Sequence, residues 1–289
     1  MAASNRPRRS VLYMPGANAR AMEKARALPA DAVILDLEDA VAPDMKAAAR
    51  GQVLAAIAGG GYGHRELVVR VNGLDTEWGH DDLAAAAKSG AQAVLLPKVS
   101  SPAVVLESLR RLDSAGAPAD LAIWCMMETA LGFLNVKEIA AASPRLACLV
   151  MGTSDLVAEL HAQHTAQRLP VVTALGLCLL AARAYGLAAL DGVHLDLEDE
   201  AGFAAACQQG RDLGFDGKTL IHPKQIAACN QAFSPSAAEI AQARRILAAH
   251  AEATAAGKGI VLVDGKLIEN LHVEAAKRTL ALADAVAPS

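Results

Sequence analysis

One pattern repeats along most of the chain and constrains its fold more than any other feature. A short run of β-branched and other apolar residues is followed by one or two polar residues and then by an alanine-rich helical segment. Segments of these lengths fit parallel strands joined by crossover helices. The eight runs span residues 10–14, 32–37, 66–71, 93–97, 121–127, 146–151, 187–193 and 218–221.

Eight strand–helix units in about 230 residues predict an α/β fold, a TIM (β/α)8 barrel. Hydrophobic residues make up 53% of the chain but aromatic residues only 3%, so the core must consist of Ala, Val, Leu and Ile, which suits this class. The main alternative is an open doubly wound sheet, which often carries a glycine-rich turn after its first strand. The glycines at 59–63 instead close a helix, so the barrel is favoured.

The pattern changes after residue 233, and this divides the chain into two predicted parts. We expect residues 1–233 to form the catalytic barrel and residues 234–289 to form a C-terminal extension, either a lid or an arm onto a neighbouring subunit. The extension reads as a helix at 236–254, capped by Ser234 or Ser236, a break at 257–259, a hairpin of 260–263 and 266–268 around Asp264–Gly265, and a helix at 273–285.

Charge and hydropathy exclude several classes of partner. The net charge of −4 provides no basic field for nucleic acid. The polar, basic first nine residues are not followed by an apolar signal segment, and no apolar stretch reaches membrane-spanning length. The five cysteines are odd in number and form no CxxC pair, as expected for reduced, buried thiols. We therefore expect a cytoplasmic protein with no membrane partner.

Polar side chains follow the predicted strands at the end where barrel enzymes hold their active sites. Any one such residue is more often a solvated loop residue or a helix cap, but seven strands share the feature. Charges inside the strand pattern, at Asp36 and Arg70, must be paired, bound to metal or turned into the barrel mouth. In strand order the residues are Asp36, Glu38 and Asp39; Arg70 and Asn72; Lys98; Glu128 and Thr129; Asp155; Asp191; and His222.

The acidic members of this set predict a divalent cation. Carboxylate oxygens without clustered Cys or His favour Mg²⁺, or Mn²⁺, over zinc. Glu128 and Asp155 follow adjacent strands and would suit a metal that takes one or two protein carboxylates and completes its shell with water and substrate oxygens. Arg70 would bind the substrate or stabilise an oxyanion beside the metal.

Nine stretches, taken together and in order, carry a family resemblance that covers residues 8–269. The chain resembles the citrate lyase β-chain/malyl-CoA lyase family, also called the HpcH/HpaI aldolase family. The matching stretches are RRSVLYMPGAN, AVILDLEDAV, LVVRVNG, VLLPKV, METALG, LVMGTSDL, DGVHLDLED, FDGKTLIHPKQI and VDGKLIE.

The resemblance implies a TIM barrel that assembles as homo-trimers or hexamers. It implies that Glu128 and Asp155 bind Mg²⁺ and that Arg70 is the catalytic arginine. Glu38 and Asp39 resemble the carboxylates that hold the metal's waters and the arginine. Asp264 resembles an aspartate that acts catalytically from the tail of a neighbouring subunit, although an Asp-Gly turn alone would also explain it.

The implied reaction is a retro-Claisen or retro-aldol cleavage of a small 3-hydroxyacyl-CoA such as malyl-CoA, β-methylmalyl-CoA or citramalyl-CoA. The products are a 2-oxo acid and an acyl-CoA. Arg70 would stabilise the thioester enolate, and Asp264 would transfer a proton at its carbon. Three other enzymes are alternatives: a thioesterase on the same scaffold, an aldolase for free 2-oxo acids without CoA, and a citrate lyase β subunit that takes a carrier-bound citryl group. A non-catalytic subunit that serves the assembly of a citrate-lyase-type complex is a further alternative, against which the strand-end carboxylates argue.

The expected substrate and CoA contacts are Tyr13, Pro15, Arg20, Lys24, Arg70 and Thr129. Tyr13 and Pro15 belong to a loop that could meet the CoA arm, with Arg20 and Lys24 near its phosphates. An ordinary turn followed by a solvated helix explains this segment equally well. Departures from the family pattern at Ser154, His194 and the tail bear on substrate choice.

Two further features have simpler explanations. His161 and His164 stand three apart on a predicted helix after Asp155, a spacing that can serve a metal, but a polar helix face is the more common outcome. Lys98 could form a Schiff base, yet the neighbouring carboxylates favour a role as their charge partner. His222 precedes a proline and is expected only to cap or pack.

Overall fold

The computed structural model describes residues 6–255 and 261–287, and it confirms the barrel. Eight parallel strands close on themselves in sequence order, and the last strand pairs with the first. The strands are β1 (Ser10–Pro15), β2 (Ala32–Asp36), β3 (Glu66–Arg70), β4 (Ala93–Leu96), β5 (Ala122–Met127), β6 (Leu146–Met151), β7 (Ala188–Asp191) and β8 (Gly217–Leu220). All eight predicted runs are strands, with ends displaced by a residue or two.

Alternate residues of each strand fill the inside of the barrel, as the two-residue period of a strand requires. Small and branched side chains interdigitate there, in keeping with the low aromatic content of the chain. At the start of β3 the buried Glu66 pairs with Arg8 at 2.7 Å, and the Arg8 guanidinium lies over the ring of Trp124. Side chains, not solvent, therefore occupy the barrel interior below the strand ends.

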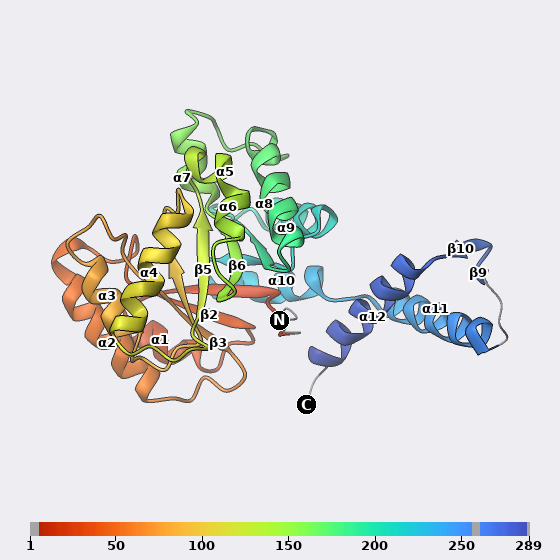
Figure 1. The fold of residues 1–289 in the computed structure, drawn as a ribbon, viewed down its shortest axis with the longest axis horizontal. Coiled ribbons are helices and arrows are strands. Elements are labelled where there is room, and N and C mark those ends of the chain that lie inside the picture. Colours follow the sequence, from red (N-terminus) through yellow and green to blue (C-terminus); the bar gives the residue numbers. More distant parts are fainter. Residues whose placement is uncertain (1–5, 256–260, 288–289) are drawn as a thin grey trace. The chain divides into compact units, whose positions relative to one another are not determined.

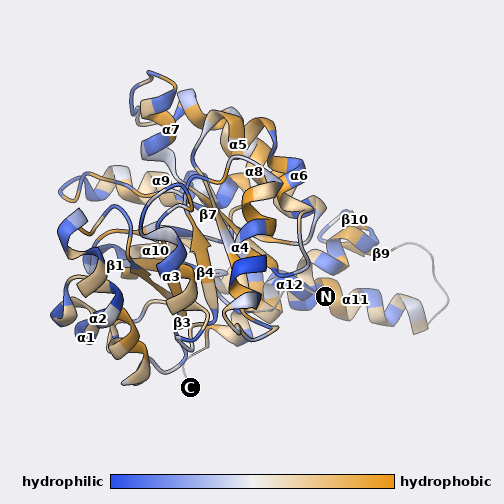
Figure 2. Cartoon of the chain, turned by 60° about the vertical axis from the view of Figure 1, so that its left-hand side comes forward, coloured by the Kyte–Doolittle hydropathy of each residue, from blue (hydrophilic) through white to orange (hydrophobic). Residues whose placement is uncertain are grey.

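Helices follow the strands and surround the barrel (Figure 1). The helices are α1 (Ala19–Ala25), α2 (Lys46–Ala58), α3 (Gly79–Ala86), α4 (Pro102–Ser114), α5 (Ala130–Leu134), α6 (Val136–Ala140), α7 (Thr153–Glu159), α8 (Val172–Ala184), α9 (Glu200–Leu213) and α10 (Ile226–Phe233), with 3-10 turns η1 (Pro43–Met45), η2 (Leu169–Val171) and η3 (Pro223–Gln225). In Figure 2, α4 carries both hydrophilic and hydrophobic residues, whereas α8 is mostly hydrophobic and exposes Leu180; strands such as β4 are hydrophobic.

Local capping explains where several helices begin. Thr129 accepts a hydrogen bond from the Gly132 N–H at the start of α5, and Asp199 accepts one from the Gly202 N–H at the start of α9. The glycine after α2, Gly59, closes that helix, as expected from the sequence. These caps set the loops that lead out of the strands, where the polar residues lie.

The chain divides into two compact units, the barrel (Arg8–Ala232) and an extension that begins at Phe233. The extension holds α11 (Ala237–Ala255), β9 (Val261–Val263), β10 (Lys266–Ile268) and α12 (Asn270–Ala285). Ser236 caps α11 by accepting from the Glu239 N–H, and α12 packs against α11 (Figure 1). The predicted break at 257–259 and residue 260 of the predicted hairpin lie outside the described residues.

Two predictions made from composition can be compared with the structure. All five cysteines are buried and none forms a disulfide, as expected. Within residues 6–255 and 261–287, no helix combines the length and the apolar content that crossing a bilayer requires.

Candidate active site

The barrel brings together seven of the polar residues predicted at the strand ends. They come from the segments after β2, β4 and β5, from β2 and β3 themselves, and from the first turn of α7 after β6. Ion pairs, hydrogen bonds and charge interactions connect all seven. We call this set the acidic centre: Asp36, Glu38, Asp39, Arg70, Lys98, Glu128 and Asp155.

Arg70 is held rigidly on the inside of the barrel. Its Nε and Nη2 each lie 2.6 Å from a carboxylate oxygen of Asp36, and its Nη1 lies 2.9 Å from Glu38 Oε2. Below it, the ring of Tyr13 lies 4.9 Å from the guanidinium carbon. Burial opposes the charged form, but the bonds and charge of Asp36 outweigh it and raise the pKa of Arg70. The expectation that charges within these strands are paired is confirmed.

The segment that carries Glu38 and Asp39 is fixed by a lysine that the sequence analysis did not single out. Lys46, at the start of α2, donates to the carbonyls of Leu37 and Glu38 and to the side chain of Asn72. Its side chain is buried, and a buried lysine must find such partners. Nothing in the spacing of Lys46 distinguished it from a solvated helix residue.

Glu128 is a buried carboxylate placed by backbone atoms. Its Oε1 accepts from the Lys98 N–H at 2.7 Å. A Cβ at position 152 would lie 2.3 Å from Glu128 Oε2, so only glycine leaves room for this carboxylate. Burial raises the pKa of Glu128 to about 7; the Lys98 N–H lowers it, and the negative charge of Asp155 raises it. Gly152 therefore belongs to the site for a steric reason.

Lys98 contacts other members of the acidic centre through both its backbone and its side chain. Its Nζ lies 2.6 Å from Glu38 Oε1 and 3.6 Å from Asp155 Oδ2. Burial lowers the pKa of Lys98, but the hydrogen bond and charge of Glu38 outweigh this and raise it. A lysine held charged in this way is a poor nucleophile, so the geometry favours the charge-partner interpretation over a Schiff base.

The donor set at Glu128 and Asp155 fits Mg²⁺. Both side chains offer only carboxylate oxygens, and both neighbour further carboxylates with too few cations to balance them. Among the described residues no group of three or more Cys, His, Asp or Glu forms a complete metal cage. Two protein carboxylates, with the remaining positions left to water and substrate, match the way in which Mg²⁺ is commonly held.

Asp191, grouped with the other strand-end residues in the sequence, does not join the acidic centre. It is fully buried, with Arg168 Nη1 at 2.6 Å and Lys218 Nζ at 2.9 Å. Arg168 lies beyond α7 and was not anticipated. We call Arg168, Asp191 and Lys218 the sealed ion cluster. Asp191 and Lys218 are buried, Arg168 is partly buried, and the pairing among the three corresponds to a structural role.

The two histidine interpretations have different outcomes. The predicted helix through His161 and His164 was wrong, because α7 ends at Glu159 and His161 adopts a left-handed conformation with a φ of 52°. His222 behaves as expected: its Nδ1 accepts from the Lys224 N–H and caps η3.

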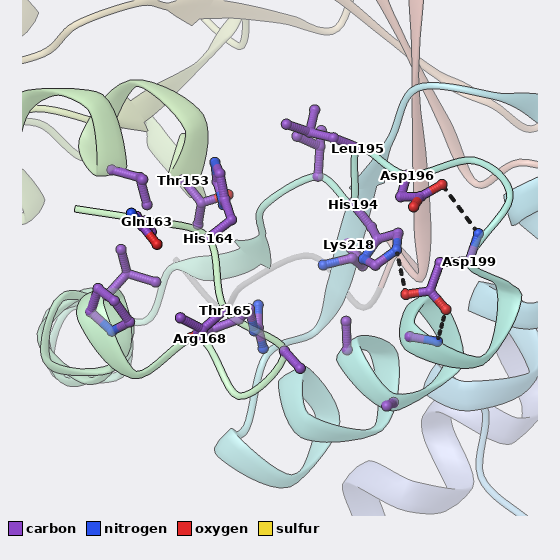
Figure 3. Close-up of a pocket in the computed structure, with 18 residues that line it drawn as sticks. Thr153, Gln163, His164, Thr165, Arg168, His194, Leu195, Asp196, Asp199 and Lys218 are labelled. Atoms are coloured by element: carbon purple, nitrogen blue, oxygen red, sulfur yellow. Dashed lines mark hydrogen bonds and ion pairs between the residues drawn. The ribbon is translucent and has the colours of Figure 1, made fainter. Parts of the chain in front are cut away.

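A cavity of about 400 Å³ lies beside the sealed ion cluster, and Arg168 and Lys218 are among the residues that line it. Thr153 and His164 lie on one side of it, His194 and Asp199 on the other, and Lys218 extends from β8 between them (Figure 3). Thr153 is the first residue of α7, the helix that carries Asp155. His194, expected to influence substrate choice, is thus placed on the wall of this cavity.

The expected CoA contacts are spread around β1 and α1. Tyr13 packs inside the barrel, Pro15 ends β1, and Arg20 and Lys24 are exposed on α1. Thr129 follows Glu128 and caps α5.

Asp264 belongs to the second unit. It lies in the turn between β9 and β10 with a φ of 50°, and its carboxylate is 3.3 Å from Arg245. The turn geometry is that of the predicted hairpin, and more than half of its side chain is exposed.

Residues 9–223 match the model of the HpcH/HpaI aldolase/citrate lyase family. The chain is 54% identical over 287 residues to the (3S)-malyl-CoA thioesterase of Cereibacter sphaeroides (strain KD131 / KCTC 12085), covering 99% of this chain and 98% of that protein. It is 37% identical to citrate lyase subunit beta of Escherichia coli (strain K12), covering 96% and 94%. It is 35% identical to the L-malyl-CoA/beta-methylmalyl-CoA lyase of Cereibacter sphaeroides (strain ATCC 17029 / ATH 2.4.9), covering 94% and 93%.

The fold also matches a solved structure over nearly its whole length. Protein CitE from Mycobacterium tuberculosis, in complex with magnesium, acetoacetate and coenzyme A, superposes with a TM-score of 0.79 at 32% identity. The match covers 97% of this chain and 99% of that one.

Proposed function

This chain belongs to the HpcH/HpaI aldolase/citrate lyase family, and on that premise we propose that it is a Mg²⁺-dependent enzyme of a small 3-hydroxyacyl-CoA. We place hydrolysis of a malyl-CoA-like thioester first and carbon–carbon cleavage of the same substrate second. The family resemblance in the sequence favours the opposite order. The higher identity to the malyl-CoA thioesterase, 54% against 35% for the malyl-CoA lyase, reverses it.

The observation that carries the proposal is the buried Arg70 at the edge of the carboxylates Glu38, Glu128 and Asp155. Both candidate reactions place negative charge on the thioester oxygen. Hydrolysis forms a tetrahedral oxyanion there, and carbon–carbon cleavage forms an enolate. A fixed guanidinium that faces this oxygen stabilises either charge. Arg70 therefore supports both reactions.

We assign the metal to Glu128 and Asp155. When bound, Mg²⁺ supplies Lewis-acid polarisation of the hydroxyl and carboxylate end of the substrate. Glu128 is oriented for this role by the Lys98 N–H and by the space above Gly152. Asp36 fixes the fork of Arg70, which limits the motion of the guanidinium during the reaction.

Glu38 and Asp39 have different roles in this proposal. Glu38 accepts from both Arg70 and Lys98, so it positions these cations. Asp39 is more than half exposed and has longer contacts, 3.5 Å to Arg70 and 3.8 Å to Lys98. A carboxylate in that state can orient and deprotonate a water that attacks the thioester carbon.

Carbon–carbon cleavage remains the second candidate because the acidic centre has the components it requires. A carboxylate takes the proton of the substrate hydroxyl as the bond breaks, and Arg70 holds the enolate oxygen. Asp264, from the extension of a neighbouring subunit in a trimer or hexamer, would return a proton to the enolate carbon. Tyr13, Pro15, Arg20, Lys24 and Thr129 remain our candidates for contacts to CoA and the acyl group.

The two reactions are separated by their products. Purified protein would be given malyl-, β-methylmalyl- and citramalyl-CoA, each with Mg²⁺ and with EDTA. Free CoA and 2-oxo acid would be measured separately. Free CoA with the hydroxy acid, only in the presence of metal, supports the thioesterase. A 2-oxo acid with acyl-CoA supports the lyase. Turnover of none of the three would count against a free CoA substrate and leave a carrier-bound citryl group to test. Activity in EDTA would contradict the metal assignment.

A further inference from the structure

Lys98 connects the two sides of the acidic centre. Its ammonium lies between Glu38, which follows β2, and Asp155, which follows β6, at 2.6 Å and 3.6 Å. Asp39 lies 3.8 Å away. The backbone N–H of the same residue holds Glu128, which follows β5. One residue thus touches both carboxylates that we assign to the metal.

The backbone of Lys98 is in a conformation that such a residue rarely adopts. Its φ of 48° lies in the left-handed region, where a non-glycine residue carries a local strain cost. This conformation follows directly after Pro97 at the end of β4 and directs the N–H at Glu128 Oε1. The neighbouring hydrogen bonds and ion pairs offset the strain, and the contact to Glu128 depends on it.

We propose that Lys98 is a built-in substitute cation. In the metal-free enzyme its ammonium contacts Asp155, a carboxylate that we assign to Mg²⁺, and it competes with the metal for that carboxylate. The inference rests on the metal assignment of the proposed function. The side chain is half exposed, so the ammonium can withdraw toward solvent and keep its shorter contact with Glu38 when the metal enters. The backbone N–H stays on Glu128 throughout.

This arrangement has two opposite consequences for stability and binding. Without metal, the ammonium screens Glu38, Asp39 and Asp155 from one another and stabilises the folded chain. With metal, the same charge repels the incoming cation and weakens its binding. Lys98 therefore sets a lower metal affinity than the carboxylates alone would give, while it preserves their arrangement when no metal is bound.

The test compares Lys98→Met, Lys98→Val and wild type by calorimetric titration with Mg²⁺ and by thermal unfolding in EDTA and in Mg²⁺. Methionine removes the charge but, like lysine, is unbranched at Cβ. Valine also removes the charge, and its branched Cβ resists the left-handed conformation. Lys88→Met, at an exposed position just beyond α3, controls for the loss of one positive charge.

We expect Lys98→Met to bind Mg²⁺ about tenfold more tightly than wild type. Its Tm falls in EDTA, and its rise on adding Mg²⁺ exceeds that of wild type. A purely structural lysine would lower both Tm values equally. Lys98→Val binds more weakly than Lys98→Met because its N–H no longer points at Glu128. Lys88→Met behaves as wild type.

Unchanged or weaker binding by Lys98→Met would overturn the competition, and equal binding by the Val and Met variants would overturn the backbone role. Two further arms test the metal assignment independently. Glu128→Ala and Asp155→Ala must lose Mg²⁺ binding in the wild-type background. If they bind normally, the metal lies elsewhere, and both proposals fail. If they lose it while Lys98→Met binds as wild type, only the inference about Lys98 fails.

Discussion

The acidic centre and the sealed ion cluster are built from the same residue types at the same end of the barrel, yet their charge balance is opposite. In the acidic centre four carboxylates form ion pairs with Arg70 or Lys98, and a fifth, Glu128, accepts only the backbone N–H of Lys98. In the sealed cluster two cations, Arg168 and Lys218, share the one carboxylate of Asp191. The first is partly open and short of positive charge, which suits metal and substrate. In the second, Asp191 is fully buried and paired with both cations, which suits a structural connection between β7, β8 and the segment before η2.

Strand parity separates the two sites. Ala32 and Ile34 face the barrel interior, so Asp36, two residues further on, faces the same way and meets Arg70. In β7 the interior residues are Ala188 and Leu190, so Asp191 faces the opposite side and meets Lys218. Two aspartates that both end a strand are thus assigned to different roles by a shift of one residue.

The largest expected effect is on stability, from a substitution that removes the carboxylate of the sealed ion cluster. Asp191→Asn leaves the buried Lys218 and the partly buried Arg168 without a counter-charge, and we expect a loss of about 3–5 kcal/mol in the free energy of unfolding. Urea denaturation measures it. Asp199→Asn is the matched control and should be nearly neutral, because Asn also caps a helix. If Asp191→Asn kept wild-type stability, the distinction between a sealed joint and an open site would be lost.

The next largest effect is on activity, from a substitution that disturbs the acidic centre without unfolding the barrel. Arg70→Lys keeps one charge but cannot hold Asp36 and Glu38 in a planar fork. We expect kcat/KM to fall about 10²–10³-fold. Mg²⁺ affinity and Tm should stay close to wild type. A fall of less than about fivefold would contradict the assignment of the oxyanion to Arg70.

The pH dependence of the free energy of unfolding would sharpen the contrast between the acidic centre and the sealed ion cluster. Burial raises the pKa of Glu128, in the acidic centre, to about 7. In the metal-free enzyme a carboxyl whose pKa is raised by folding contributes stability that is fully present when the pH is below the pKa of the unfolded chain. This stability is lost as the pH rises to about 7, the pKa in the folded chain. The loss is at most about 3 kcal/mol. Urea denaturation in EDTA from pH 5 to 8 measures it. Glu128→Gln should remove this slope, whereas Glu138→Gln, at an exposed position on α6, should retain it.

The smallest expected signal tests whether the acidic centre needs Asp264 from a neighbouring chain to complete the active site. Arg70→Ala and Asp264→Ala are each expected to be inactive in carbon–carbon cleavage. If Asp264 acts on a neighbour's barrel, dissociating and reassembling an equal mixture restores about one site in four by random pairing. Activity is measured before and after mixing. No recovery would place Asp264 outside the shared site.

The sequence predicted the fold and most of the acidic centre, because both depend on local patterns. Apolar runs with alanine-rich crossovers predicted all eight strands, and the strand ends predicted Arg70 with its carboxylates. It did not find Lys46, Arg168 or Gly152, because the role of each depends on contacts with other segments, such as that of Lys46 with Asn72. It also placed His161 and His164 on a helix that a left-handed turn at His161 had already ended.

The amino-acid sequence alone determined that the chain forms a barrel and that carboxylates and an arginine stand at its strand ends. This follows because periodicity and strand length are properties of neighbouring residues. The tertiary structure decided which of these charges meet, since the side on which a strand-end residue points depends on its parity within the closed sheet. It also decided that Lys98 reaches three carboxylates, because they come from segments that only barrel closure brings together.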